Sequence, residues 1–219
     1  MRAKDVLAVF ERLGVMVSGH FAYTSEGRHG SVYVNKDAIY LHTEETSRLC
    51  YELAMRAFRM CPDIDCVVGP EKGGIILSQW VGYHLAQKKR RDVLSVFAEK
   101  KMRDNVAQVG VPSTDFDFAF ARGYGNVVAE KNVLIVEDVM NTGKSVEKLV
   151  RCVRKAGGFV EGIGAICNRG SVFSSDIGVA PKLFALLDIS LPSWLADECP
   201  MCAQGIALNT ELGAGKQVA

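Results

Sequence analysis

The sequence predicts an α/β fold in which a mainly parallel sheet is flanked by helices and carries a small N-terminal hood. Short apolar runs alternate along the chain with longer segments of helical periodicity, an order typical of βαβ units and of a sheet covered on both faces. Paired glycines, Gly157 and Gly158, end one of the helical segments. With 48% hydrophobic and 23% charged residues among 219, the chain can bury one full core, which excludes disordered and fibrous classes.

Residues 1–42 predict a helix followed by a hairpin, and we call this hairpin the hood. The apolar residues of the first segment follow helical spacing: Val6, Leu7, Phe10 and Leu13. Gly14 ends that helix. In the polar, aromatic-rich stretch that follows, Val32 and Val34 alternate with Tyr33, as in a short strand.

Residues 43–190 predict the α/β core, and residues 191–219 are expected to complete the hood or the surface. The expected helices span 44–60, 73–90 and 144–156, and the expected strands span 66–69, 93–98, 133–138, 159–168 and 183–189. Residues 99–125 are long for a connection inside a compact domain and begin with basic side chains. We therefore expect a lid over an anionic ligand there.

Charge and cysteine usage narrow the class of protein. The formal net charge of +1 gives no overall attraction for nucleic acid or for an anionic membrane. No apolar run approaches the roughly 20 residues of a membrane helix, and the N-terminus lacks a signal-peptide core. Five of the seven cysteines fall in apolar segments, where a reduced thiol packs as a small hydrophobe. We expect a cytoplasmic protein.

The stretch V-L-I-V-E-D-V-M-N-T-G-K-S (133–145) is the most informative part of the sequence. Glu137 and Asp138 come at the end of an apolar strand, and ligands of parallel sheets bind beyond the carboxyl ends of the strands. The small residues that follow bring backbone N–H groups to the start of a helix, where a phosphate is favoured. These features indicate a sugar phosphate, with a plain strand-to-helix turn as the alternative. A Walker loop is excluded because Asp138 stands where its first glycine is needed.

This stretch resembles the phosphoribosyl pyrophosphate (PRPP) signature of the type I phosphoribosyltransferases. V-V-G-P-E-K-G-G-I-I-L is similar to the pyrophosphate loop of that family. The hood stretch G-H-F-A-Y-T-S-E-G-R-H-G-S-V-Y-V-N-K, the segment F-A-E-K and the ending D-E-C-P-M-C-A-Q-G-I-A-L resemble orotate phosphoribosyltransferases. The resemblance implies the type I phosphoribosyltransferase fold, a PRPP-binding core, and transfer of the phosphoribosyl group to orotate with Mg²⁺ on the pyrophosphate.

The resemblance also implies a role for each matching residue. The PRPP-binding set would be Glu71, Lys72, Gly73, Gly74, Glu137, Asp138, Val139, Met140, Asn141, Thr142, Gly143, Lys144 and Ser145. The base would contact Thr142, Arg169 and Lys36, with the Arg169 guanidinium pairing with the orotate carboxylate. The catalytic set would be Asp138 together with Lys100, Lys101 and Arg103 of the lid, which in this family commonly acts across a homodimer. Burial of Trp80 and Tyr83 against a second subunit would fit that dimer.

The sequence departs from the family pattern at three places, and two other functions stay open. The lid holds no histidine and lacks the K-D-H-G-E-G-G type of sequence, Thr24 stands at a substrate-side lysine position with Glu26 as an insertion beside it, and Asn141 replaces a threonine. A phosphoribosyltransferase for a purine base and a PRPP-binding regulator without turnover are the alternatives. The chain offers no spare segment for a DNA-binding module, which disfavours the regulator.

Several candidate residues have simpler interpretations. Lys100, Lys101 and Arg103 can form a solvated turn, and Arg169 can pair with a core carboxylate. Cys199 and Cys202 have zinc-type spacing, but no second C-x-x-C or H-x-x-x-H pair follows, so a four-ligand site within one chain is not expected. Three histidines lie in or beside the hood, and polar surface roles stay open for them on at least equal terms with substrate contacts: His20, His29 and His42.

Overall fold

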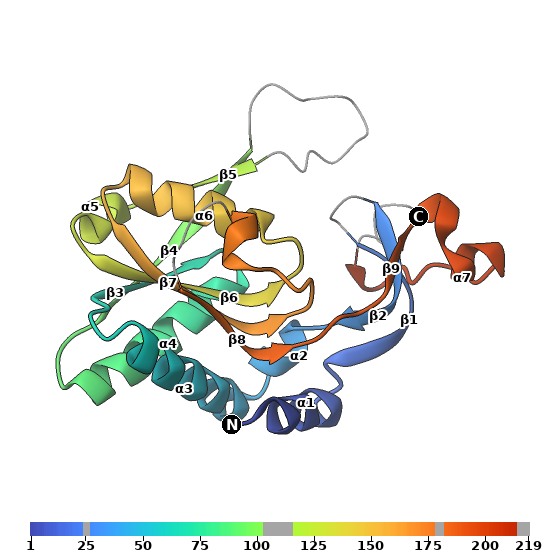
Figure 1. Cartoon of the computed structure of the whole chain (residues 1–219), viewed down its shortest axis with the longest axis horizontal. Helices are drawn as coiled ribbons and strands as arrows, with labels where there is room; N and C mark the ends of the chain where they lie inside the picture. Colours follow the sequence, from blue (N-terminus) through green and yellow to red (C-terminus); the bar gives the residue numbers. More distant parts are fainter. Residues whose placement is uncertain (24–26, 103–115, 178–181, 214–219) are drawn as a thin grey trace.

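The protein, described by a computed structural model, has a central six-stranded sheet and a separate three-stranded sheet (Figure 1). The structure describes residues 1–23, 27–102, 116–177 and 182–213. The strands are β1 (Met16–Ala22), β2 (Arg28–Val34), β3 (Cys66–Pro70), β4 (Leu94–Met102), β5 (Phe116–Ala119), β6 (Asn132–Met140), β7 (Phe159–Asn168), β8 (Lys182–Asp188) and β9 (Ser193–Leu195). The helices are α1 (Ala3–Arg12), α2 (Asp37–Tyr40), α3 (Thr43–Met60), α4 (Gly73–Lys89), α5 (Tyr124–Val128), α6 (Lys144–Lys155) and α7 (Pro200–Ala203), with 3₁₀ turns η1 (Ser174–Ile177) and η2 (Ala196–Glu198).

The central sheet confirms the predicted fold class. Its strand order is β5-β4-β3-β6-β7-β8, and all neighbouring pairs are parallel except β4 with β5. Every residue of β3 is buried, as expected for a strand covered on both faces. The expected helices and strands of the core all form, with ends that differ by a few residues.

Two hydrophobic clusters fill the space on either side of the sheet. Leu134 and Val136 of β6 belong to the cluster beneath α1, α3 and α4, whereas Val133 and Ile135 belong to the cluster beneath α6. This alternation follows from the period of two along a strand. Figure 1 shows the same layers, with α5 and α6 above the sheet and α1, α3 and α4 below it.

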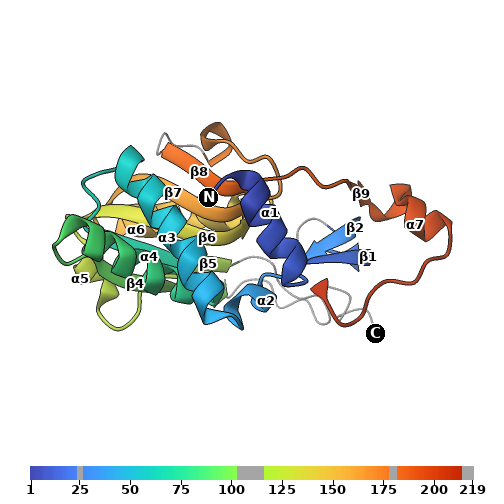
Figure 2. The same ribbon diagram turned by 90° about the horizontal axis from the view of Figure 1, so that it is seen from below.

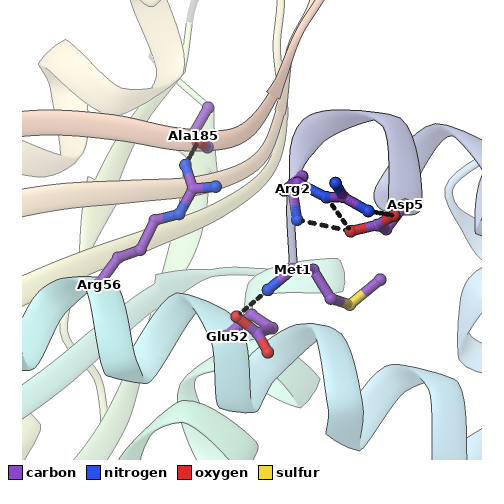
Figure 3. Close-up of polar contacts among 6 residues, drawn as sticks. All are labelled: Met1, Arg2, Asp5, Glu52, Arg56 and Ala185. Carbon is purple, nitrogen blue, oxygen red and sulfur yellow. Dashed lines mark hydrogen bonds and ion pairs between the residues drawn. The ribbon is translucent and has the colours of Figure 1, made fainter.

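Polar contacts join the first helix and α3 to the rest of the molecule (Figure 3). The Met1 amine pairs with the Glu52 carboxylate on α3. Arg56, one turn further along α3, donates to the carbonyl of Ala185 on β8. These contacts fix α1 and α3 against one edge of the sheet. None of the helices in the described parts of the chain is long and apolar enough to cross a membrane.

The hood hairpin belongs to a three-stranded antiparallel sheet built from both ends of the chain, and from here on the hood means this whole sheet. β1 pairs with β2 from Met16↔Val34 to Ala22↔His29, which confirms the predicted hairpin. β9 then pairs with the other edge of β2, with Gly30 opposite Ser193. In Figure 2 the hood and α7 extend to one side of the central sheet. The C-terminal part of the chain thereby returns to the N-terminal hairpin.

The segment 99–125 differs from the predicted lid at both of its ends. β4 continues to Met102, and β5 pairs with it antiparallel, from Glu99↔Ala119 to Met102↔Phe116. The pattern F-D-F-A explains the strand, because Phe118 is buried in the cluster beneath α6. Lys100 and Lys101 are consequently on a strand instead of a loop. Arg103 lies outside the described residues, as do Thr24 and Glu26.

Candidate functional site

Glu137 and Asp138 lie in β6 at the carboxyl edge of the parallel strands. Both residues are buried, with exposed fractions of 8% and 4%. The strand continues beyond them to Met140. Backbone N–H groups hold both carboxylates, because the Asp138 N–H lies 3.1 Å from Glu137 Oε1 and the Val139 N–H lies 2.7 Å from Asp138 Oδ1. The two buried acids are therefore fixed in place before any ligand binds.

Asp138 is the centre of a three-residue polar cluster. Lys36 Nζ lies 2.7 Å from Asp138 Oδ2, and the Tyr40 hydroxyl donates to the same oxygen at 3.1 Å. Burial alone would lower the pKa of Lys36, but the charge and hydrogen bond of Asp138 more than offset it, so this pKa is raised. Burial, followed by the Asp138 charge, raises the pKa of Tyr40. Lys36 thus stays charged and Tyr40 stays a hydrogen-bond donor.

The surroundings of Glu137 disfavour the charged form of its carboxyl group. Burial raises its pKa above the ordinary range of a carboxyl, and the neighbouring Asp138 charge raises it further. The Lys36 charge acts in the opposite direction but is smaller. Two adjacent acids facing a single ammonium form a site that favours an additional positive charge.

A cavity of about 140 Å³ opens beside these acids. Its lining consists of Lys36, Pro70, Glu71, Gly73, Lys100, Phe118, Glu137, Asp138, Val139 and Ser145, and we call it the acidic cavity. The Lys100 backbone N–H donates to Glu71 Oε1 at 2.9 Å, while the Lys100 ammonium lies 4.8 Å from the centre of the Phe116 ring. Carboxylates and the basic residues Lys36 and Lys100 therefore line the cavity together.

Gly73 is required for the close approach of α4 to Asp138. A Cβ atom on Gly73 would lie 1.9 Å from Asp138 Oδ2 and 2.8 Å from the Tyr40 hydroxyl. Gly74 packs as tightly, since its Cβ would lie 2.4 Å from Pro70. Glycine is the one residue that leaves this space free.

A second, smaller cavity of about 90 Å³ lies between the hood and the core. It is lined by Tyr23, Arg28, Asn141, Thr142, Arg169, Gly170, Leu191 and Ser193, and we call it the arginine cavity. The Arg169 guanidinium stacks 3.8 Å from the centre of the Tyr23 ring and donates to Asn141 Oδ1 at 3.4 Å. Among the described residues Arg169 has no ion-pair partner, so the alternative of a core carboxylate partner is not observed.

The loop between β6 and α6 separates the two cavities. Gly143 adopts φ 74° at the start of α6, a conformation that glycine accepts readily. The Arg169 and Gly170 N–H groups donate to the Met140 carbonyl at 2.9 and 3.2 Å. This loop brings the first N–H groups of a 12-residue helix next to both cavities.

The remaining predicted site residues take different positions. Lys72, Lys101 and Lys144 are exposed near the site without lining either cavity. Met140 is 2% exposed and belongs to the core beneath α6, so its side chain does not face a ligand. Sequence reasoning missed Tyr23, Arg28 and Tyr40. Tyr23 and Arg28 stand in the polar, aromatic-rich hood stretch, where nothing singled them out, and Tyr40 ends the four-residue helix α2, which was not predicted.

The structure contradicts the expectation for the hood histidines and the C-terminal cysteines. His20 and His29 are 3% and 8% exposed, so they are not surface residues. They meet Cys199 and Cys202 in one cluster, so four metal-ligating groups do come together within one chain. Spacing along the sequence missed this because the two pairs come from opposite ends of the chain.

Comparisons with known proteins agree on one family. The model of the phosphoribosyl transferase domain matches residues 39–172. The orotate phosphoribosyltransferase of Pelotomaculum thermopropionicum is 36% identical over 206 residues, which cover 94% of this chain and 95% of that protein.

Solved structures of this family share the fold. The orotate phosphoribosyltransferase of Mycobacterium tuberculosis has a TM-score of 0.60 at 20% identity, covering 84% of this chain and 94% of that one. The adenine phosphoribosyltransferase of Thermoanaerobacter pseudethanolicus has a TM-score of 0.57 at 14% identity, covering 82% and 99%. The fold is thus common to enzymes named for different bases.

Proposed function

Because the chain belongs to the phosphoribosyltransferase family, we propose that it transfers the 5-phosphoribosyl group of PRPP to orotate, giving orotidine 5′-monophosphate and pyrophosphate. The observation that carries this proposal is the pair of cavities on either side of the β6–α6 loop. One cavity is acidic. The other surrounds Arg169, which stacks on Tyr23 and has no ion-pair partner in the described part of the chain. The sequence relative named for the same reaction supports orotate as the base.

The acidic cavity would hold the ribose of PRPP. Glu137 and Asp138 would accept hydrogen bonds from the ribose hydroxyls. As the C1–O bond to the diphosphate breaks and a bond from the orotate ring nitrogen forms, positive charge develops at C1, and the ring nitrogen releases its proton to solvent. The buried acids would stabilise that charge, and Lys36 and Tyr40 would hold the Asp138 carboxylate in position through their contacts with Oδ2.

The β6–α6 loop would hold the 5′-phosphate. Asn141, Thr142, Gly143, Lys144 and Ser145 stand at or before the first turn of α6. Unsatisfied N–H groups and the helix dipole favour a phosphate there. Positioning at this end fixes the ribose relative to the base.

The arginine cavity would hold orotate. A guanidinium offers two parallel donors to a carboxylate, and stacking on Tyr23 fixes the plane of Arg169. Arg28 lines the same cavity and donates to Ser193, at 3.0 Å to Oγ and 2.6 Å to the carbonyl, so the hood strands β2 and β9 would close over the base.

The diphosphate would lie between the start of α4 and β4, with Mg²⁺ bound to it. The residues of the acidic cavity fit that ion, because Glu71 and Asp138 provide carboxylate oxygens, the ligands that Mg²⁺ prefers. Mg²⁺ would neutralise the leaving diphosphate as a Lewis acid. Lys72 and the glycine backbone at Gly73 and Gly74 would contact the diphosphate directly, and Lys100 and Lys101 would approach it from β4. Arg103 of the proposed lid is outside the described residues.

A homodimer would form through the exposed aromatic face of α3 and α4. Tyr51 and Tyr83 are 46% and 51% exposed, and both rings pack edge-on against His84, which stacks on Trp80. Aromatic residues of this kind are enriched at protein interfaces. The described cysteines are all free, which supports a reducing, cytoplasmic setting.

Pyrophosphate release tests the reaction. Purified protein is supplied with PRPP, Mg²⁺ and one base at a time from orotate, uracil, adenine, guanine, hypoxanthine and xanthine. We expect turnover with orotate alone, loss of at least a hundredfold in the Asp138→Asn variant, and no turnover when Mg²⁺ is chelated. Turnover with a purine instead would assign a different base, and tight PRPP binding without turnover on any base would indicate a regulator.

A further inference from the structure

Four metal-ligating side chains meet in the hood, away from the two cavities. His20 comes from β1, His29 from β2, and Cys199 and Cys202 from the segment that includes α7. One ligand atom from each residue lies within 4.8 Å of all the others. In Figures 1 and 2 the strands and α7 that carry them lie together at the outer end of the hood.

Four of the six distances between these atoms are close to the edges of a tetrahedral zinc site. Zn–S bonds of about 2.3 Å and Zn–N bonds of about 2.0–2.1 Å give ligand-to-ligand separations of about 3.3–3.8 Å. His20 Nε2 lies 3.2 Å from His29 Nδ1, 3.4 Å from Cys199 Sγ and 3.7 Å from Cys202 Sγ. His29 Nδ1 lies 3.2 Å from Cys202 Sγ. These four separations are close to those of a tetrahedral site, and the remaining two are at most 4.8 Å.

The other ring nitrogen of His20 supports the same interpretation. Its Nδ1 lies 2.6 Å from the Ile206 carbonyl, a group that can only accept a hydrogen bond. Nδ1 therefore carries the proton, and the lone pair of Nε2 faces the cluster. Histidine ligands of metals are commonly oriented by such a carbonyl.

The C-terminal segment also needs a cross-link, because it has almost no hydrophobic core of its own. Among the described residues 196–213, Cys199 is the single buried side chain. Neither η2 nor α7 contains a buried apolar residue apart from this flanking cysteine. Small lobes without a core generally depend on a disulfide or a metal.

We propose that His20, His29, Cys199 and Cys202 bind one structural Zn²⁺ that fastens the C-terminal segment to the β1–β2 hairpin. Zn²⁺ is chosen because a Cys₂His₂ set is typical of structural zinc and because two thiolates neutralise its charge. Both thiols lose their protons to solvent when the ion binds. Four protein ligands fill a tetrahedron, so the ion stabilises the hood and takes no part in the transfer reaction.

Metal content of the untagged protein tests the proposal. We expect about one zinc per chain by elemental analysis, and near zero in Cys199→Ser, Cys202→Ser and His29→Gln. Cys152→Ser and His42→Gln are matched controls, a buried cysteine in the core beneath α6 and an exposed histidine outside the cluster, and both should keep the zinc. Zinc that persists in the cluster variants, or wild-type protein that binds iron instead, would overturn the assignment.

Wild-type protein supplies a second test in case the variants fail to fold. Exchange of the ion for Co²⁺ should produce the visible bands of tetrahedral cobalt and a thiolate charge-transfer band in the near ultraviolet. Removal of the ion by a chelator should lower the melting temperature by several degrees. Absence of these bands, or a Cys199–Cys202 disulfide found by mass spectrometry of the metal-free native protein, would refute the site. Neither readout depends on turnover, so this proposal fails or succeeds independently of the proposed reaction.

Discussion

Replacing Gly73 by alanine tests whether the position of Asp138 controls catalysis. The added Cβ would lie 1.9 Å from Asp138 Oδ2, whereas ordinary contact begins at 3.4 Å, so the carboxylate or the start of α4 must move by about 3.4 − 1.9 = 1.5 Å. Oδ2 is the atom that accepts from both Lys36 and Tyr40, at 2.7 and 3.1 Å. Because Oδ2 is the tip of a side chain whereas α4 is packed against the sheet, we expect the carboxylate to move, and a shift of that size breaks both hydrogen bonds.

The expected result is a fall in kcat/KM of about a hundredfold or more with the fold intact. Misplacement of a reacting group by about 1 Å costs on the order of 10² in rate, and removal of one stabilising group costs about 10²–10³. The assay is pyrophosphate release with PRPP and orotate, together with PRPP affinity by calorimetry and thermal unfolding followed by circular dichroism.

Gly82→Ala is the matched control on the same helix. A Cβ on Gly82 would make an ordinary contact of 3.5 Å with Ser95, so α4 need not move. This variant should keep wild-type activity, and as an alanine inside a helix it should gain about 0.5–1 kcal/mol of stability. If Gly73→Ala stays within threefold of wild type in kcat/KM and in PRPP affinity, the proposed role of Asp138 is refuted.

Three further perturbations test the electrostatics, the base and the assembly. Burial raises the folded-state pKa of Glu137, so its contribution to stability is lost as pH rises through that pKa. The melting temperature of Glu137→Gln should therefore lie above that of the wild type at pH 8, and the difference should disappear toward pH 4. Each unit by which the pKa is raised corresponds to about 1.4 kcal/mol in the free energy of unfolding. A difference that does not change with pH contradicts this. Arg169→Lys should raise the KM for orotate about 10–100-fold and leave that for PRPP nearly unchanged, since a charged hydrogen bond is worth about 1.5–3 kcal/mol; equal effects on both substrates argue against base contact. Tyr83→Glu should convert the proposed dimer to a monomer in analytical ultracentrifugation, whereas an unchanged mass would exclude this face as the interface.

The sequence determined the local structure well. The apolar run before Glu137 and Asp138 predicted β6, and the small residues after it predicted the turn into α6, because strand and helix periodicities are encoded over a few neighbouring residues. The family resemblance selected Arg169, which the structure places in a cavity. The antiparallel arm at β5 was missed, since four residues carry too little periodicity to separate a strand from a loop.

Only the tertiary structure decided which distant residues meet. Lys36 and Tyr40 contact Asp138 across 102 and 98 residues of chain, and His20 meets Cys199 across 179. A pattern of polar and apolar residues tells which face of an element is buried, but many distant partners could satisfy that face equally well. The return of β9 to β2 brings the C-terminal segment to the hood, and with it the cluster of two histidines and two cysteines that sequence spacing had not predicted.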